Sequence, residues 1–159
     1  MNSNPPSKYA VNKYVLPIHK SNLIRIDTES SPAHIGKLAN SIDLLAPEET
    51  PVLAAADGII TFVNTGSVVG GPDISFWDYS NFIVIMHSND EYSRYDHLAF
   101  GSSDVVVGQQ VKAGRPIARI GMTGYTFIPH LHFQVFVFTG YNIWTDFDTI
   151  EVKEFGIIY

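Results

Sequence analysis

The 159-residue sequence contains no cysteine. Disulfides and thiolate metal ligands are therefore excluded, and any metal ion must be held by His, Asp or Glu side chains. No apolar run approaches the length of a membrane-spanning helix, so we expect no membrane insertion. The first thirty residues also lack the basic and then apolar segments of a secretory signal peptide.

Positive charge is scarce as well. Ten Lys and Arg stand against 16 Asp and Glu, the net charge is −6, and the basic residues form no cluster. This balance argues against nucleic acid as the main partner, because such a partner favours a basic patch. Charged residues make up only 16% of the chain and hydrophobic residues 45%, which indicates a compact globular protein.

Helical periodicity persists nowhere for more than about two turns, whereas alternating strand patterns recur along the chain. We therefore predict an all-β, antiparallel fold, either a small barrel or a folded sheet. A flexible segment at 1–13 precedes a single domain at 14–159. Strands are expected at 52–56, 59–63, 81–87, 91–98 and 129–138, with Asp57-Gly58 as a tight hairpin turn between the first two.

His130 and His132 lie two residues apart on the last of these strands, with Leu131 between them. Both histidines therefore leave the same face, with α-carbons about 6.6 Å apart, while Leu131 points into the core. The pair suits a metal chelate, or one metal ligand beside one catalytic base. An exposed polar pair on an amphipathic strand is the alternative.

Other side chains extend this pattern. His97 ends a strand, and His34 precedes Asp43 by nine positions. Two histidines, one carboxylate and an open position form a known catalytic zinc arrangement, in which bound water becomes nucleophilic near neutral pH. Further histidines nearby can take the proton of that water and stabilise the developing oxyanion. The chain thus has the parts for hydrolysis without a Ser or Cys nucleophile.

The remaining His and Asp residues are assigned simpler roles. We interpret His19 as a surface residue and His87 as a structural or surface imidazole. Asp57 belongs to its turn. The other carboxylates of this group are interpreted as solvated charges: Asp90, Asp96 and Asp104.

These pieces, in this order, resemble the M23 family of zinc endopeptidases, the lysostaphin- and LytM-like enzymes that cut peptidoglycan peptides. The resemblance covers about residues 30–138. It rests on the segments IDLLAPEETPVLAAADGII, NFIVIMHSNDEYSRYDHL, VVVGQQVKAGRPIARIGMTG and PHLHFQV. The combination of YDHL with PHLHFQV is specific to the family, whereas either match alone is not.

The resemblance implies one zinc ion per chain, held by His34, Asp43 and His132. It implies that His97 and His130 are the two catalytic histidines, and that the substrate is a peptidoglycan peptide. A secreted, cell-envelope or virion-associated location, or release from the cytoplasm, follows from that substrate class. The same resemblance predicts a groove flanked by the long loop 64–80 and by residues 123–127. Within the loop, packing is favoured over substrate binding for its aromatic residues: Phe76, Trp77 and Tyr79.

Two positions depart from the family pattern. The early histidine usually lies four residues before the Asp, where this chain has Ala39, so His34 reaches the metal only if the segment between loops out. Glu49 stands where the family usually has Gly, which matters if that backbone needs a positive φ.

Three other functions compete with a peptidase. The first is a non-catalytic M23-like domain that binds cell wall or regulates. The second is a carrier module, because VVVGQQVKAGRPIARIG resembles the hairpins of biotinyl and lipoyl domains; those need an exposed Lys at a hairpin tip between two such repeats, and we find none. The third is a metal-dependent hydrolase with another substrate.

Overall fold

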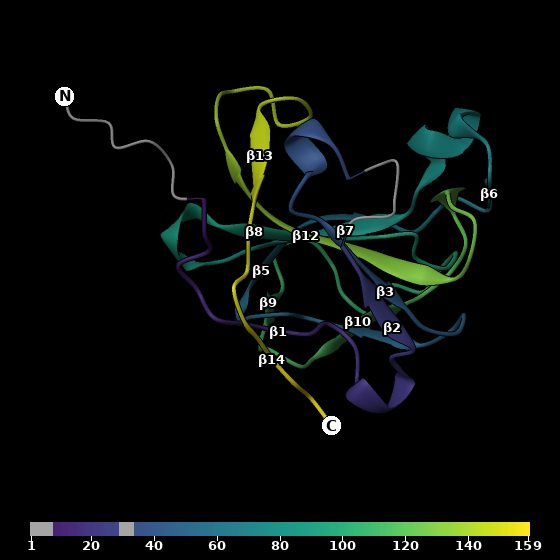
Figure 1. Ribbon diagram of the computed structural model, residues 1–159, viewed down its shortest axis with the longest axis horizontal. Helices are drawn as coiled ribbons and strands as arrows, with labels where there is room; N and C mark the ends of the chain where they lie inside the picture. The colour runs from purple at the N-terminus through teal and green to yellow at the C-terminus, as the bar shows by residue number, and fades with distance from the viewer. Residues whose placement is uncertain (1–7, 29–33) are drawn as a thin grey trace.

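One antiparallel sheet dominates the computed structural model, which describes residues 8–28 and 34–159 (Figure 1). Its strands hydrogen-bond in the order β2 (Arg25–Asp27), β3 (Ile42–Leu45), β12 (His130–Phe138), β8 (Tyr92–Asp96), β7 (Phe82–Met86), β5 (Gly58–Asn64) and β9 (Gln110–Val111), and β13 (Phe147–Ile150) pairs with the second half of β12. The predicted all-β antiparallel class is confirmed, in the form of a folded sheet with β2 and β9 at the two ends of the order.

Three short strand pairs complete the β structure. β1 (Tyr14–Val15) runs parallel to β14 (Phe155–Gly156), β4 (Pro51–Leu53) antiparallel to β10 (Pro116–Arg119), and β6 (Gly70–Gly71) parallel to β11 (Gly124–Tyr125). The helices of the described residues are 3₁₀ turns: η1 (Lys20–Asn22), η2 (Gly36–Leu38), η3 (Ile74–Tyr79) and η4 (Ser88–Asp90). None of these helices has the length and apolar character to cross a membrane.

The predicted hairpin at Asp57-Gly58 is wrong. β4 pairs with β10, whereas β5 pairs with β7 and β9, so the chain passes from one sheet to another at this point. The Asp57 carboxylate instead accepts hydrogen bonds from the backbone N–H of Ala113 and from the Lys112 ammonium. The Asp-Gly pair thus makes a corner rather than a strand reversal.

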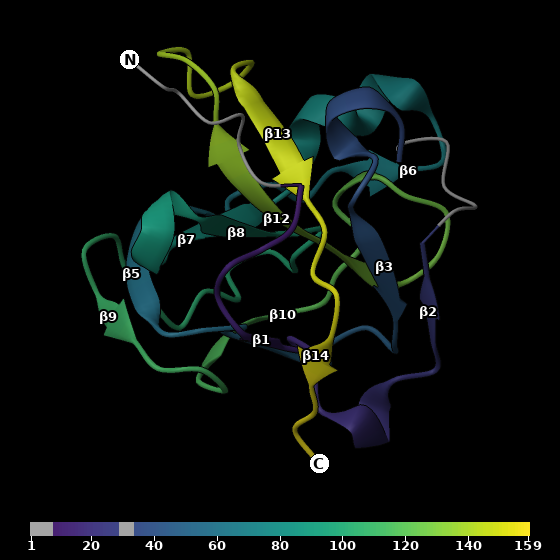
Figure 2. The same ribbon diagram turned by 60° about the vertical axis from the view of Figure 1, so that its left-hand side comes forward.

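The main core lies between the large sheet and a layer formed by β1, β14, β4 and β10. Both views show the labelled strands of this layer, β1, β10 and β14, on one side of the sheet (Figures 1 and 2). β12 supplies Leu131, Phe133 and Val135 to this core. Because side chains alternate along a strand, the residues between them face the opposite side of the sheet. That opposite face carries His130, His132, Gln134, Phe136 and Phe138.

The pairing register around β12 places acidic and imidazole side chains in one row. His132 lies opposite Asp43 on β3 and opposite Asp96 on β8. Directly opposed residues share a sheet face at the closest separation that an antiparallel sheet allows. The register therefore assembles an Asp–His–Asp row from three distant parts of the sequence.

The predicted domain boundary at residue 14 stays a prediction. Residues 1–7 lie outside the described part of the chain. Between there and β1, the backbone N–H groups of Ala10 and Val11 donate to the carbonyl of Glu151 and to the carboxylate of Glu91, respectively.

Candidate active site

Three side chains converge on one point above the centre of the large sheet. His34 Nε2 lies 3.2 Å from Asp43 Oδ1 and 3.4 Å from His132 Nδ1, and His132 Nδ1 lies 3.2 Å from Asp43 Oδ1. The nine-residue spacing is accommodated because the intervening chain forms η2 and a turn before entering β3. The two side chains at this end of the site are almost fully enclosed, with 1% of His34 and 11% of Asp43 exposed.

The donor set fits a zinc ion. Tetrahedral zinc with bonds of about 2.0–2.1 Å separates its ligand atoms by roughly 3.3–3.4 Å. The three distances between the ligand atoms, from 3.2 to 3.4 Å, match three edges of such a tetrahedron. Two imidazoles and one carboxylate also correspond to a catalytic rather than a structural zinc site, in which water or substrate is the fourth ligand.

Hydrogen bonds on the outer side of each imidazole direct its lone pair inwards. His132 Nε2–H donates to Gln134 Oε1 at 3.0 Å, and His34 Nδ1–H donates to the carbonyl of Thr28 at 3.3 Å. With these tautomers, inferred from the partners, the two inner nitrogens and the Asp43 carboxylate are all acceptors. Acceptors this close together require a cation, either a metal ion or a proton, between them.

The charge state of Asp43 agrees with that requirement. Burial alone would raise the pKa of this carboxyl, but His132 and His34 at hydrogen-bond distance outweigh burial and hold the pKa well below its usual range. Asp43 is therefore an ionised carboxylate at neutral pH.

His130 and His97 lie beside the three converging residues. His130 Nδ1–H donates to the carbonyl of Ile128 at 2.8 Å, and His97 Nδ1–H donates to the carbonyl of Thr123 at 2.7 Å. Their Nε2 atoms are consequently the free acceptors, and that of His130 lies 3.7 Å from Asp43 Oδ1. The two rings are 4.7 Å apart between centroids. Burial, reinforced by the proximity of His130, lowers the pKa of His97 to about 4, so His97 is neutral at neutral pH.

The backbone at His97 adopts a left-handed conformation, with φ of 63°. This region is uncommon for a residue other than Gly and is found most often where function requires it. Two hydrogen bonds hold it: His97 N–H donates to Ser80 Oγ at 3.1 Å, and Gly121 N–H donates to the His97 carbonyl at 2.8 Å. The chain thereby turns the His97 ring back towards His130.

The interpretation of Asp96 as a solvated charge is wrong. Its side chain is buried and accepts two hydrogen bonds from Arg94, at 2.7 and 3.0 Å, and a third from Ser80 Oγ at 3.0 Å. Burial raises the pKa of such a carboxyl, but the Arg94 charge and hydrogen bonds lower it below its ordinary value. The buried ion pair supports β8 directly beside His132.

Sequence reasoning did not identify Gln134 as part of the site, and it placed Ser80 and Thr123 only within the two predicted groove walls. Gln134 carried a usable signal, since it follows His132 by two residues on the same strand and so had to share its face. The contacts that Ser80 and Thr123 make to His97 carried none, because they depend on how two distant loops fold.

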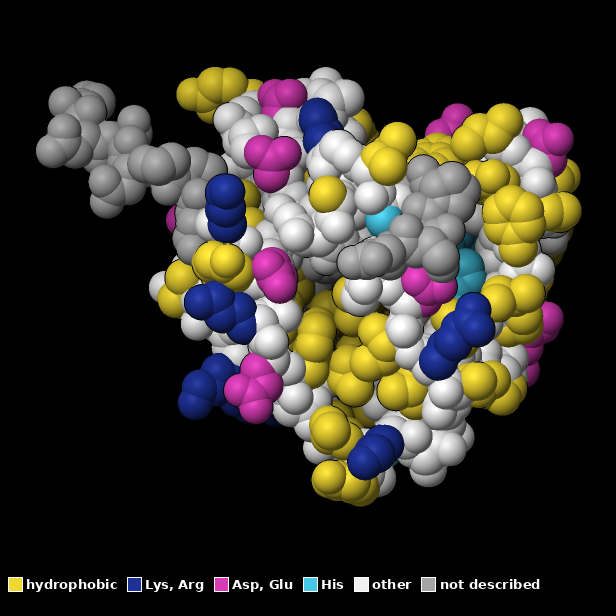
Figure 3. Space-filling view, in the orientation of Figure 1, with side chains coloured by type: hydrophobic (Ala, Val, Ile, Leu, Met, Phe, Trp, Pro, Cys, Tyr) yellow, Lys and Arg dark blue, Asp and Glu magenta, His cyan; other side chains and the backbone are white. Residues whose placement is uncertain are grey.

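A pocket of about 170 Å³ opens beside the histidines. Figure 3 shows histidine side chains in a hollow on this face of the molecule. Trp77 and Tyr125 line the pocket, with ring centroids 6.3 Å apart. Both predicted walls, the 64–80 loop and residues 123–127, thus contribute a side chain. We predicted that the aromatic residues of the 64–80 loop pack rather than bind substrate. This holds for Phe76, which lies against Gly71, but not for Trp77, which is 45% exposed and lines the pocket.

The simpler assignments are mostly borne out in the structure. His87 is a buried structural imidazole that contacts the Asp57 carbonyl and the Ser93 hydroxyl at 2.7 Å each. His19 is half-buried, and Asp90 and Asp104 are exposed. Glu49 does occupy a left-handed backbone position, with φ of 68°, and its carboxylate pairs with Arg119 at 2.7 Å.

Comparisons with known proteins find peptidases. The model of peptidase family M23 matches residues 37–143, which begins three residues after His34. The DD-carboxypeptidase/endopeptidase Mpg of Neisseria meningitidis is 37% identical over 102 residues, covering 64% of this chain and 20% of that protein. The peptidoglycan DD-endopeptidase ShyA of Vibrio cholerae is 33% identical over 100 residues, covering 62% and 20%.

Solved structures agree. A zinc-containing peptidase from Vibrio cholerae superposes with a TM-score of 0.56 and 28% identity, covering 78% of this chain and 36% of that one. In Mpg and ShyA, the part that this chain matches is about a fifth of the length of the protein. Because the family model accounts for more than half of the sequence, the chain belongs to peptidase family M23.

Proposed function

We propose that this chain is a zinc-dependent endopeptidase that hydrolyses peptide bonds in the stem peptides or cross-links of peptidoglycan. The observation that carries the proposal is the near-equilateral arrangement of His34 Nε2, Asp43 Oδ1 and His132 Nδ1, all within hydrogen-bond distance of one another. The names of Mpg and ShyA, both endopeptidases, support the substrate class. A cell-envelope site of action follows from that class.

His34, Asp43 and His132 would hold one zinc ion. When bound, zinc polarises a carbonyl group and lowers the pKa of water towards neutrality. Proton transfer is left to the side chains of the protein. Because each Nδ1–H donates to a backbone carbonyl, His130 and His97 each present an Nε2 acceptor towards the same space.

A neutral imidazole in this position can accept the proton of the attacking water and then donate it to the departing amine. The protonated form can also donate a hydrogen bond to the developing oxyanion of the tetrahedral intermediate. Two histidines side by side therefore allow one to act as base while the other stabilises charge.

Metal content tests the ligand set. We expect about one zinc per chain in the purified protein and a large loss in His132→Ala. The matched control is His19→Ala, which removes a half-buried histidine outside the site. Equal zinc in wild type and His132→Ala would contradict the assignment.

Digestion of purified peptidoglycan tests the activity. The zinc-loaded wild type should release peptides with new amino termini, detected by mass spectrometry of the products. His130→Ala should retain zinc and release far less. A zinc-loaded wild type that cleaves none of several wall chemistries would instead support the non-catalytic alternative.

A further inference from the structure

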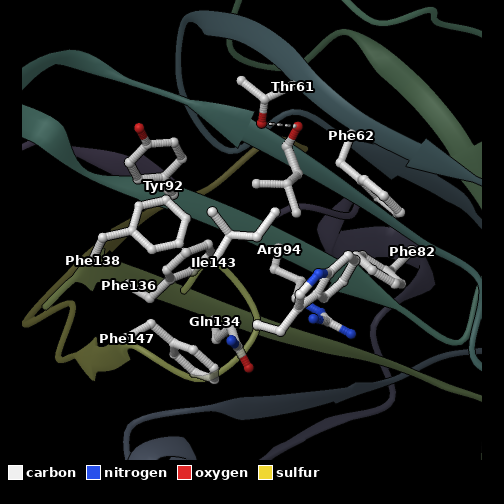
Figure 4. Close-up of a pocket in the computed structure, with 12 residues that line it drawn as sticks. Thr61, Phe62, Phe82, Tyr92, Arg94, Gln134, Phe136, Phe138, Ile143 and Phe147 are labelled. Atoms are coloured by element: carbon white, nitrogen blue, oxygen red, sulfur yellow. Dashed lines mark hydrogen bonds between the residues drawn. The ribbon is translucent and has the colours of Figure 1, made fainter. Parts of the chain in front are cut away.

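A second pocket, of about 270 Å³, lies on the same sheet face as the histidines, farther along β12 (Figure 4). We call it the aromatic pocket. Phe136 and Phe138 of β12 contribute to its lining, together with Phe62 on β5 and Phe82 on β7. Its volume suits one ring-sized group rather than a long chain.

The aromatic pocket is continuous with the pocket at the histidines. The same residues line both pockets: Arg94, Gln134, Trp144 and Phe147. Phe136, in the aromatic pocket, follows His132 by four residues, which is about 13 Å along the strand. A ligand that extends from His132 to the aromatic pocket therefore spans the length of about four extended residues.

The aromatic pocket offers flat rings to a ligand. Phe62 and Phe82 stack with ring centroids 4.5 Å apart, and the Trp144 ring lies nearly perpendicular to both, at 5.7 and 6.5 Å. Trp144 remains 59% exposed. A pyranose ring carries C–H groups on its faces, and such groups pack well against the electron-rich face of an aromatic ring. The lining thus provides a surface on which a sugar ring can stack.

Two nitrogen donors lie where the two pockets join. Arg94 binds the Asp96 carboxylate through Nε and Nη2, and Gln134 accepts hydrogen bonds through Oε1. Within the described part of the chain, Nη1 of Arg94 and Nε2 of Gln134 form no hydrogen bond, and no enclosed side-chain nitrogen lacks a partner. Both nitrogens are therefore accessible, and they can donate to the oxygens of a ligand.

This combination favours an uncharged ligand with an apolar face and polar edges. An apolar side chain would cover the donors of Arg94 and Gln134 without pairing them. An anion would gain little from Arg94, because the Asp96 carboxylate already balances its charge. A sugar ring with an acetamido group meets both conditions, since its C–H face packs on the rings while its hydroxyl and carbonyl oxygens accept from the two nitrogens.

The proposed substrate contains such a ring. In peptidoglycan, short stem peptides are attached to strands of N-acetylated amino sugars, so a peptide bond in a stem or cross-link lies only a few residues from a sugar. We propose that the aromatic pocket binds one sugar ring of the glycan strand that carries the peptide being cleaved. The inference rests on the proposed peptidase function. Trp144 and Phe147 lie beyond residue 143, so the match to the family model does not include this part of the pocket.

Binding can be tested separately from catalysis, because the chain has two tryptophans in different positions. Trp144 lines the aromatic pocket, whereas Trp77 lines only the pocket at the histidines. Titration of the zinc-loaded protein with N,N′-diacetylchitobiose, a disaccharide of N-acetylglucosamine, should shift the indole N–H resonance of Trp144 and leave that of Trp77 in place. N-acetyl-leucinamide, an apolar amide, should shift neither.

Three results of this titration overturn the proposal. The first is no Trp144 shift with the disaccharide. The second is a Trp144 shift with the apolar amide alone, which indicates a pocket for apolar side chains. The third is a shift produced only by raising the protein concentration, which indicates a second copy of the chain in the pocket.

Kinetics provide the second arm. The substrates are cross-linked muropeptides that keep their sugars and the same muropeptides after an amidase has removed the sugars, both acetylated so that their charges match. The wild type should cleave the sugar-bearing form about tenfold better in kcat/KM, as expected from stacking of one ring together with its hydrogen bonds. Equal rates on the two forms contradict the subsite.

Variants locate the effect. The double variant Phe62→Leu, Trp144→Leu keeps apolar side chains but removes two flat rings, so the ratio of the two rates should fall to near one. Tyr141→Leu, at a fully exposed position on the same segment as Trp144, should keep the wild-type ratio. A wild-type ratio in the double variant overturns the assignment to this pocket. Failure of the wild type to cleave either form contradicts the peptidase function, while the resonance titration still decides whether the pocket binds a sugar.

Discussion

Gln134 accepts a hydrogen bond from His132, with Oε1 of the amide 3.0 Å from Nε2 of the imidazole. The same oxygen accepts from Ser41 Oγ at 3.3 Å, and the Gln134 side chain is buried. Two donors on one oxygen fix the orientation of the amide. Gln134 therefore fixes the proton of His132 on Nε2 and leaves Nδ1 directed at Asp43 and His34, which is the role of an outer partner to a metal-binding histidine.

The first prediction concerns that partner. Gln134→Met keeps a similar volume but removes the acceptor, so we expect zinc affinity to fall roughly 10- to 100-fold. Competition with a chelator of known affinity measures the change. Gln134→Glu keeps an oxygen acceptor in place and should bind zinc far better than Gln134→Met. Equal affinity in wild type and Gln134→Met would show that the hydrogen bond does not support the metal site.

The second prediction concerns His97. His97→Ala removes a neutral acceptor beside the proposed metal ligands, so kcat should fall by about 10²- to 10⁴-fold, the usual contribution of a proton-transferring side chain. Zinc content should stay near that of wild type, because His97 is outside the set of three ligand atoms. Rates on peptidoglycan fragments and metal analysis of the same samples check both statements. Loss of zinc together with activity would assign His97 to metal binding instead.

The third prediction concerns the buried ion pair between Asp96 and Arg94. Asp96→Asn removes the charge that balances Arg94, and breaking a buried pair costs about 3–5 kcal/mol. Since 28% of the Arg94 side chain is exposed, we expect a smaller loss of about 2–3 kcal/mol in the free energy of unfolding. Urea denaturation of the zinc-loaded protein measures it. Asp104→Asn, at an exposed position, is the control and should change little.

The fourth prediction concerns acid sensitivity. Burial lowers the pKa of His87 below its ordinary value of 6.5, despite opposing contributions from the Asp57 carbonyl and Glu91. Below pH 6.5 the unfolded chain binds a proton at His87 that the folded chain resists, so acidification favours unfolding. This contribution is absent above that pH and grows as the pH falls towards the folded-state pKa.

His87→Gln removes that titration. Between pH 7.5 and 5.5, the wild type should lose up to about 1.4 kcal/mol more unfolding free energy than the variant. Denaturation curves at the two pH values provide the comparison. An identical pH dependence in both proteins would mean that His87 titrates normally in the folded state.

The strands next to the site were predictable because their sequence patterns are local. The strong alternation from His130 to Phe138 and the short gap between the expected strands 81–87 and 91–98 identify β12 and the β7–β8 pair directly. The turn at Asp57-Gly58 was misread because an Asp-Gly pair specifies a change of direction, not which strands pair afterwards. Pairing is decided by the rest of the sheet.

Charges inside the fold were harder to predict. Asp96 looks solvated in the sequence, but Arg94 lies two residues earlier on the same strand face and neutralises it. At Glu49, the unusual backbone conformation was recognisable only as a departure from a family pattern. The carrier-module alternative loses its basis, because the two strands of its presumed hairpin, β9 and β10, pair with different partners, β5 and β4.

β12 carries core residues on one face and the histidines on the other. The stability of the fold and the geometry of the site therefore depend on the same strand register. A slip of one residue against β3 or β8 would bring Leu131 and Phe133 to the solvent side and bury both histidines among aliphatic groups. Such a misaligned chain would lose its stability and the proposed metal ligands together. The register that keeps the chain stably folded is therefore also the register that assembles the proposed site.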